Sequence, residues 1–259
     1  MSAIHILASG SKANAYIIEV ENSMLLIDQG LSFREFSKRA DMLGIDISQI
    51  KGILLTHEHE DHIKGVAYTA YKLDAPVFSM AKTLEILGKN TKHPIHCRAV
   101  EKDRKVKLGA FEFTPFEIMH DAVDPVGYLV SAPGGEMVCF ATDTGKITNR
   151  MMTYINQGTR IILEANHDPA MLYRNMHYPQ LLKERIRGQF GHLSNEQSLE
   201  ALERMGENHP KTVIFSHLSE ENNSPKMLKE LVVNFRQAHC LDFKAFIANQ
   251  YNPLSIPLL

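Results

Sequence analysis

Hydrophobic and polar residues follow one another in short runs that switch between the spacing of strands and that of helices. Residues 4–7, 14–20 and 23–28 are rich in Ile, Val and Tyr and are separated by turn residues, which predicts three strands. Residues 32–44 carry apolar positions about every 3.6 residues, which predicts a helix. Further strands are predicted at 51–56 and 76–80, and further helices at 63–73 and 81–88.

The second half of the chain repeats this mixture of strands and helices. The segment APGGE, between two apolar runs, is typical of a hairpin. Predicted strands span 111–118, 126–132, 136–142, 160–165, 212–216 and 243–248, and predicted helices span 178–187, 195–206 and 225–238. Because no linker or low-complexity tract interrupts the pattern, the sequence predicts one α/β domain over residues 1–259, with two sheets flanked by helices.

Composition excludes a few classes of protein. The 28 basic and 30 acidic side chains leave a net charge of -2, so a polyanionic substrate would need a local binding site. The three cysteines are far apart and form no CxxC pair, which is typical of a reducing compartment. The sequence shows neither a transmembrane run nor a signal-peptide pattern. We therefore expect a cytoplasmic protein with no membrane partner.

Candidate chemistry begins with the stretch ILLTHEHEDH, which follows a predicted buried strand. His57 and His59 point the same way on an extended chain, because alternate residues share a face. A helix that starts near Asp61 would bring Asp61 and His62 toward a neighbouring point. Imidazole and carboxylate groups are ligands for Zn²⁺ and also suit Mn²⁺ and Fe. The stretch therefore predicts ligands for two adjacent metal sites, and a solvated charged loop is the simpler alternative.

The segment THEHEDH resembles the HxHxDH signature of the metallo-β-lactamase superfamily. That resemblance implies a four-layered αβ/βα sandwich and a dinuclear metal site, with further ligands at strand ends. Candidates for these ligands are His120 in IMHDAVDPVGY, Asp143 in CFATDTG and His217 in IFSHLSEEN. Redox relatives carry glutamate at the position of His59, so the histidine favours a hydrolytic site. By this resemblance, the first ion is held by His57, His59 and His120, the second by Asp61, His62 and His217, and Asp143 bridges the two.

Other motifs resemble the YycJ/WalJ family of bacterial proteins, which implies a 5′-to-3′ exonuclease acting on double-stranded DNA. They are LASGSKANAY, LLIDQGLS, TDTG, LEANHD, GHLSN and HLSEEN, of which the last three also resemble motifs of ribonuclease Z. One position departs from the family. Ala13 stands where relatives carry a glycine, and we expect it to restrict the turn, because glycine alone takes positive φ freely.

The charge of such a site favours phosphodiester chemistry. Two divalent ions, two carboxylates and a bridging hydroxide leave a charge of about +1, which attracts an anion and stabilises five-coordinate phosphorus. Metal binding lowers the pKa of water to roughly 7. We therefore predict a phosphodiesterase that acts on nucleic acid, and a DNA exonuclease is the activity that the motifs favour most. It would use two divalent ions (Zn or Mn, with Fe as a third candidate) and a metal-bridging hydroxide that Asp61 helps to orient.

Two residues are candidates for proton transfer. His192 lies in the loop GHLSN and is a candidate to protonate the leaving oxygen, with the Glu164 carboxylate as its partner. The simpler alternatives are that Glu164 bonds to the backbone and that His192 caps a helix.

Hydroxyl and amide side chains in two loops are candidates to hold a phosphate, with plain turns as the alternative: Ser9, Ser11 and Asn14, and Ser219, Asn222 and Asn223.

The sequence leaves several alternatives open. Lys183, Arg185 and Arg187 are as compatible with the solvated face of a helix as with contacts to a phosphate backbone, and we assign them no role here. A phosphodiesterase for small cyclic or nucleotide diesters would use the same site. A thioester or lactone hydrolase would use the same fold, and a regulatory protein without activity is the fourth possibility. The oligomeric state is left open.

Overall fold

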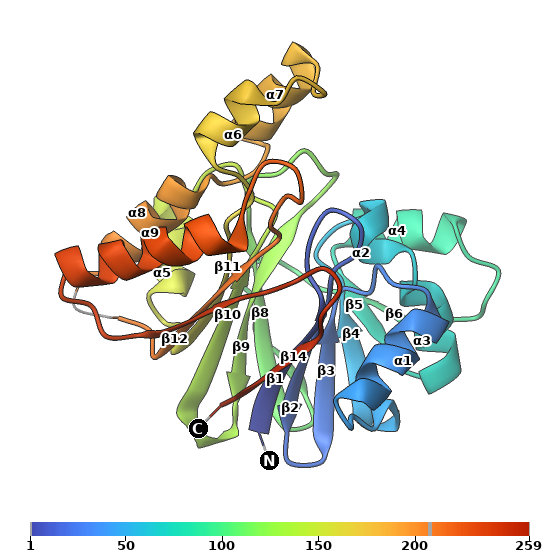
Figure 1. The fold of residues 1–259 in the computed structure, drawn as a ribbon. Coiled ribbons are helices and arrows are strands. Elements are labelled where there is room, and N and C mark those ends of the chain that lie inside the picture. Colours follow the sequence, from blue (N-terminus) through green and yellow to red (C-terminus); the bar gives the residue numbers. More distant parts are fainter. Residues whose placement is uncertain (1, 207–208, 259) are drawn as a thin grey trace.

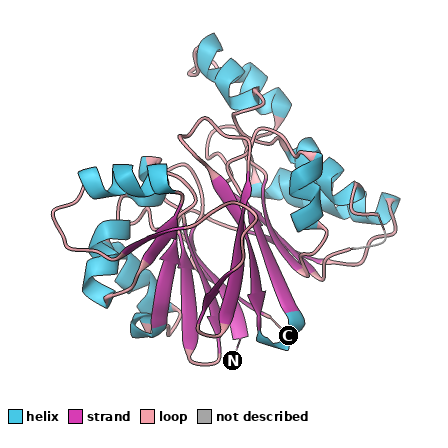
Figure 2. Cartoon of the chain, turned by 180° about the vertical axis from the view of Figure 1, so that it is seen from behind, coloured by secondary structure: helices cyan, strands magenta, loops and turns pink. Residues whose placement is uncertain are grey.

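The strands form two sheets that lie against each other, with helices on the outer sides (Figures 1 and 2). The structure is a computed structural model that describes residues 2–206 and 209–258. Within these residues each sheet has seven strands. The arrangement confirms the predicted α/β sandwich, in which helices, sheet, sheet and helices form successive layers.

The first sheet is built mainly from the N-terminal part of the chain. In spatial order it contains β14 (Leu254–Pro257), β1 (Ser2–Ala8), β2 (Ala15–Val20), β3 (Ser23–Ile27), β4 (Ile50–Leu54), β5 (Val77–Ser79) and β6 (Cys97–Ala99). Its helices are α1 (Phe33–Met42), α2 (Glu60–Ile63), α3 (Val66–Leu73) and α4 (Ala81–Lys89), with a 3₁₀ turn at Ile47–Gln49. Strands β3 to β6 run parallel, whereas β1 pairs antiparallel with β2 and with β14.

The second sheet is built from the C-terminal part. In spatial order it contains β13 (Lys244–Ile247), β12 (Thr212–Ser216), β11 (Arg160–Glu164), β10 (Glu136–Ala141), β9 (Val126–Ala132), β8 (Phe111–Glu117) and β7 (Val106–Leu108). Its helices are α5 (Asn149–Ile155), α6 (Pro169–Arg174), α7 (Gln180–Arg187), α8 (Asn195–Glu203) and α9 (Pro225–Ala238). Strands β10 to β13 run parallel. None of the helices in the described residues is both long and apolar enough to cross a membrane.

Most predicted elements are present, and the ones missed are short. The connection between β9 and β10 is a 3₁₀ turn at Pro133–Gly135, in which Gly134 and Gly135 take φ angles of 83° and 79°, as the predicted hairpin requires. The sequence did not reveal α5, α6, β6, β7 or β14. Strand β6 shows why, because all three of its residues are exposed and it carries no alternation of buried and exposed positions.

The two sheets bury aromatic and aliphatic side chains between them. Tyr16 from the first sheet meets Phe140 from the second edge to face, with ring centroids 4.8 Å apart and both rings fully buried. Because parallel strands place their carboxyl ends at the same edge, the loops that follow β3, β4, β10, β11 and β12 gather at one end of the sandwich. Figure 1 shows this end at the top, opposite the two termini.

A buried arginine ties α1 to two distant segments of the chain. Arg39 is only 8% exposed, and its Nη1 donates to the backbone carbonyls of Leu7 at 2.9 Å and Gln250 at 2.6 Å. Its Nε donates to Glu35 Oε1 at 2.8 Å. The guanidinium therefore joins the outer helix, the first strand and the segment that leads into β14.

We expect Arg39→Ala to lower the free energy of unfolding by about 2–4 kcal/mol, because two carbonyls lose a charged donor in a buried setting. Urea unfolding monitored by circular dichroism measures the change. The neighbouring Lys38 is exposed, so Lys38→Ala should stay within about 0.5 kcal/mol of the unmodified chain. Equal effects of the two substitutions would show that Arg39 is not such an anchor.

Candidate metal centre

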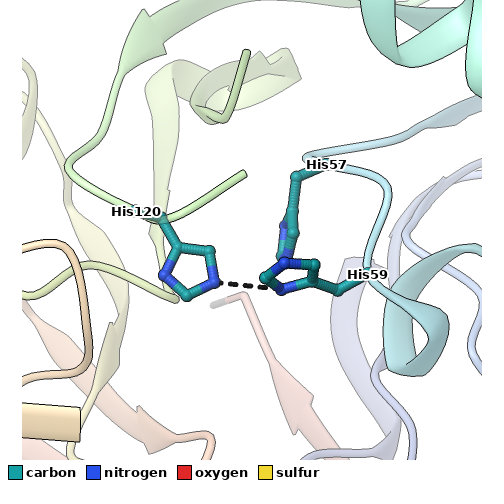
Figure 3. Close-up of side chains that lie close together, drawn as sticks. All are labelled: His57, His59 and His120. Atoms are coloured by element: carbon teal, nitrogen blue, oxygen red, sulfur yellow. Dashed lines mark hydrogen bonds between the residues drawn. The ribbon is translucent and has the colours of Figure 1, made fainter. Parts of the chain in front are cut away.

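Three histidines converge at the edge between the two sheets. His57 and His59 lie in the loop after β4, and His120 follows β8. One nitrogen of each lies within 4.8 Å of the others, and His120 Nε2 is 3.2 Å from His59 Nδ1 (Figure 3). His57 Nε2 is buried with no hydrogen-bond partner in the described residues. His120 Nδ1 donates instead to the Gly191 carbonyl at 3.1 Å, which leaves Nε2 directed at the cluster. These three nitrogens suit a single metal ion.

A second group lies beside the first and consists of Asp61, His62, Asp143 and His217, whose ligand atoms are within 4.8 Å of one another. His62 Nε2 is 3.3 Å from Asp61 Oδ2 and 3.5 Å from Asp143 Oδ2. His217 Nε2 is 3.4 Å from Asp61 Oδ2. Both His217 Nε2 and Asp143 Oδ2 are buried without a hydrogen-bond partner in the part of the chain that the structure describes. Buried polar atoms are normally satisfied, so these unpaired atoms have the chemistry and position of cation ligands.

Buried carboxylates fix which nitrogen of two of these histidines faces the cluster. Asp28 is fully buried, and its Oδ2 accepts a hydrogen bond from His62 Nδ1 at 2.8 Å. Glu164 Oε1 accepts one from His217 Nδ1 at 2.9 Å. The Nε2 atoms therefore point inward while Nδ1 is hydrogen-bonded, an arrangement that is usual for metal-binding histidines. We did not identify Asp28 from the sequence, although an aspartate at the end of a buried strand was a signal that could have revealed it.

Two aspartates and one histidine of the centre have positive φ angles, which non-glycine residues seldom adopt. Asp28, Asp143 and His217 follow β3, β10 and β12, and their φ angles are 56°, 55° and 55°. This left-handed region costs a non-glycine residue about 1 kcal/mol or more. The conformation turns the chain sharply after each strand. Strain of this kind is often found at functional sites, which agrees with the place of these residues in the centre.

Glu164 and His192 come together as the sequence analysis suggested. His192 Nδ1 donates to Glu164 Oε1 at 2.7 Å, and the imidazole is 21% exposed. Glu164 is fully buried, and its Oε2 accepts the backbone N–H groups of Thr144 at 2.9 Å and Leu193 at 3.2 Å. The same carboxylate thus holds His192 and His217, so its position links the candidate acid to the metal cluster.

The two groups differ in charge. Burial lowers the pKa of His57 and of His120, so both are neutral and ready to bind a metal. Burial alone would also lower the pKa of His217, but Asp143 and the other neighbouring carboxylates outweigh it and raise that pKa to about 10. The pKa of His62 is raised for the same reason, mainly by Asp143. In the metal-free chain, positive charge on these two imidazoles balances the buried carboxylates.

The predicted phosphate loop between β1 and β2 lies against the centre. Ser9 is buried, and its Oγ accepts the His217 backbone N–H at 2.8 Å. Asn14 is fully buried, and its Nδ2 lies 3.0 Å from Asp61 Oδ2. Ser9 and Asn14 therefore support metal-cluster residues in this structure. Ser11 is exposed and lines a pocket beside His192.

The second predicted phosphate-binding set is also buried, and consists of Ser219, Asn222 and Asn223. Asn223 Nδ2 donates to the Ala165 carbonyl at 2.8 Å, and the Asn222 backbone N–H donates to Ser219 Oγ at 3.1 Å. Both asparagines thus have partners within the protein. Ser219 lines the same pocket as Ser11, so these two serines have the position that a substrate contact requires.

Ala13 does not restrict its turn. The positive φ in that loop belongs to Gly10, at 148°, and Ala13 is not among the residues with positive φ. The glycine that the centre needs is Gly30, because a Cβ there would lie 1.8 Å from the Asp61 carbonyl oxygen. The close approach lets the loop after β3 pack on the metal-binding loop.

Comparison with known proteins agrees with this geometry. The beta-lactamase superfamily domain matches residues 24–218. The chain is 34% identical to exodeoxyribonuclease WalJ of Streptococcus pneumoniae over 251 residues, which cover 93% of this chain and 92% of that protein. It is 33% identical to exodeoxyribonuclease YycJ of Bacillus anthracis over 228 residues, which cover 86% of this chain and 85% of that protein.

A solved structure shows the same fold. The metallo-beta-lactamase fold protein YhfI from Bacillus subtilis superimposes with a TM-score of 0.72 at 14% sequence identity, over 98% of this chain and 99% of that one. With the two relatives above, this confirms the resemblance found in the sequence. The chain belongs to the beta-lactamase superfamily, and within it to the family that contains the WalJ and YycJ exodeoxyribonucleases.

Proposed function

We propose that the chain is a metal-dependent 5′-to-3′ exodeoxyribonuclease with a dinuclear centre. The observation that supports this most strongly is the pair of adjacent groups of histidines and aspartates, which contain buried ligand atoms with no hydrogen-bond partner among residues 2–206 and 209–258. The names of the two relatives add DNA as the substrate and the removal of terminal nucleotides as the reaction. A DNA substrate also agrees with the expected cytoplasmic location.

In this proposal seven residues hold two divalent ions, Zn or Mn, with Fe as a third candidate. When bound, the ions would supply a hydroxide nucleophile near neutral pH and would offset the charge on a phosphate under attack. The first ion would be held by His57, His59 and His120, the second by Asp61, His62 and His217, and both would share Asp143.

Asp61 has a second task in this scheme. Its carboxylate is part of the second group and is also held by Asn14 Nδ2 at 3.0 Å. Since that bond fixes the side chain, Asp61 can accept a hydrogen bond from the attacking oxygen and orient it. Asn14 is thus a positioning residue for the nucleophile.

His192 is the proposed general acid. Its Nδ1 is occupied by Glu164, so Nε2 is the nitrogen that remains for proton transfer. The bond to Glu164 also fixes the orientation of the ring. The His192 ring centroid lies 5.1 Å from that of His217 and 5.1 Å from that of His120, which places the acid beside both metal groups. It would give its proton to the oxygen that leaves phosphorus.

The first prediction from this proposed function concerns the metals. The chain should bind two divalent ions, and Asp143→Ala should bind fewer, because it removes the shared ligand. Metal-site occupancy should depend on pH at the second group. The His217 pKa of about 10 means that this imidazole must lose a proton when a metal binds, so affinity should rise as pH increases toward that value.

Titration with Zn²⁺ in weakly buffered solution, with an indicator dye, measures both the number of ions and the protons released. Filling of the second group should release more protons than filling of the first, since the pKa values of His62 and His217 are raised and those of His57 and His120 are lowered. A folded chain that takes up no metal would refute the proposed centre.

The second prediction tests the function itself. Duplex DNA with a 5′ phosphate should be shortened from its 5′ end with Mn²⁺ or Zn²⁺, and a nitrophenyl phosphodiester should be cleaved more slowly. Binding should weaken as salt rises, because phosphate contacts are ionic. End-labelled DNA and RNA, as duplexes and single strands, separate the alternatives by product length. Cleavage of thioesters or lactones, with every phosphodiester left intact, would contradict the proposal.

The third prediction separates acid from ligand. We expect His192→Ala to keep both metals and to lose roughly 10²- to 10⁴-fold in turnover of DNA, the usual contribution of a general acid. The loss should shrink on a nitrophenyl ester, whose leaving group departs without a proton. His217→Ala is the matched comparison and should lose both metal and activity on either substrate. If His192→Ala slowed both substrates equally, the role of proton donor would be excluded.

A further inference from the structure

A small pocket with both polar and apolar walls lies next to His192 and against α7. Helices α6 and α7 project from the sandwich in Figure 1. Its volume is about 170 Å³. That space suits a phosphate with part of its sugar. The side chains and backbone that line it include Ser11, Tyr178, Arg185, His192 and Ser219. The pocket therefore combines the proposed acid with hydroxyl groups, one guanidinium and the Asp121 carboxylate that pairs with it.

Helix α7 forms one wall of this pocket because its last turn packs tightly on the loop that carries His192. The His192 backbone N–H donates to the Ile186 carbonyl at 2.8 Å. A Cβ at Gly191 would lie 2.1 Å from the Arg185 carbonyl oxygen, so only glycine allows the contact. The position of Arg185 is thus set by the same loop that positions the acid.

Arg185 is held toward the pocket by a single ion pair. Its Nε bonds to Asp121 Oδ2 at 2.5 Å, and its side chain remains 59% exposed. The pair uses Nε, so the two terminal nitrogens can bind an anion while Asp121 stays in place. The other basic side chains of α7 differ. Lys183 Nζ donates to the Tyr173 carbonyl, and Arg187 lines a separate pocket with Gly145 and Gln189.

We propose that Arg185 binds a phosphate of the DNA strand on the leaving-group side of the centre, with Ser11 and Ser219 as further donors. The assignment to this side follows from His192, because the group that protonates the leaving oxygen must face the part of the strand that departs. This inference rests on the proposed function. In this proposal α7 contacts the nucleic acid, and Arg185 favours binding of a polymer over binding of a small diester.

The test compares Arg185→Ala with Arg187→Ala, a control that removes the same charge two residues farther along the chain. Both are assayed on duplex DNA with both metals present. We expect Arg185→Ala to raise KM about tenfold with a smaller change in kcat, and to reduce the slope of log Kd against log salt by about 1, as the loss of one phosphate contact predicts. Arg185→Lys should restore the slope but only part of the affinity, because lysine keeps the charge and loses the planar fork. Arg187→Ala should match the unmodified chain.

The outcomes separate the inference from the proposed function. If the unmodified chain degrades DNA and Arg185→Ala keeps its KM and salt slope, the inference is wrong and the function stands. An equal change in Arg187→Ala would also refute it, because the effect would then reflect the charge of the helix as a whole. If the unmodified chain cleaves small diesters but neither binds nor degrades DNA, the proposed function fails and the inference fails with it.

Discussion

The centre depends on the bonds between buried carboxylates and imidazole Nδ1 atoms. An imidazole that is free to rotate presents either nitrogen, and a cluster of four or more would not converge on two points. Asp28 fixes His62 and Glu164 fixes His217, in each case through a bond of less than 3 Å. Because both carboxylates are fully buried, the interaction is poorly screened and the rings stay in place. The convergence of the Nε2 atoms follows from these bonds.

The centre also joins the two halves of the chain. The first sheet supplies His57 to His62 through the loop after β4, and the second sheet supplies the groups after β8, β10 and β12. The backbone bond from His217 to Ser9 crosses the same boundary. A shift of one sheet relative to the other would therefore separate the two sets of ligands. The packing of Tyr16 on Phe140 below the centre resists that shift.

Much of this arrangement could be predicted from the sequence, because its strongest signals are local. The apolar runs revealed the long strands, and the histidine-rich stretch marked the edge at which they end. His120, Asp143 and His217 lie far apart in sequence, and only a resemblance to a known family could select them among the other histidines and carboxylates. The role of Asp28 was not predicted, because its partner His62 is 34 residues away in sequence. The packing of α7 on the loop that carries His192 could not be predicted either, since the contact between Gly191 and Arg185 is a property of tertiary packing.

The left-handed backbone at Asp28, Asp143 and His217 lowers the stability of the chain, because the residue types that the centre needs are strained in this conformation. Glycine is the residue that this conformation favours, so glycine at any of the three positions would relieve local strain while deleting a functional group. The sequence therefore retains local strain at two candidate ligands, Asp143 and His217, and at Asp28, which fixes the ring of His62. Metal ions that bind only the folded chain would offset that loss of stability by mass action. The folded chain is therefore expected to be more resistant to unfolding when metal is bound than when it is absent.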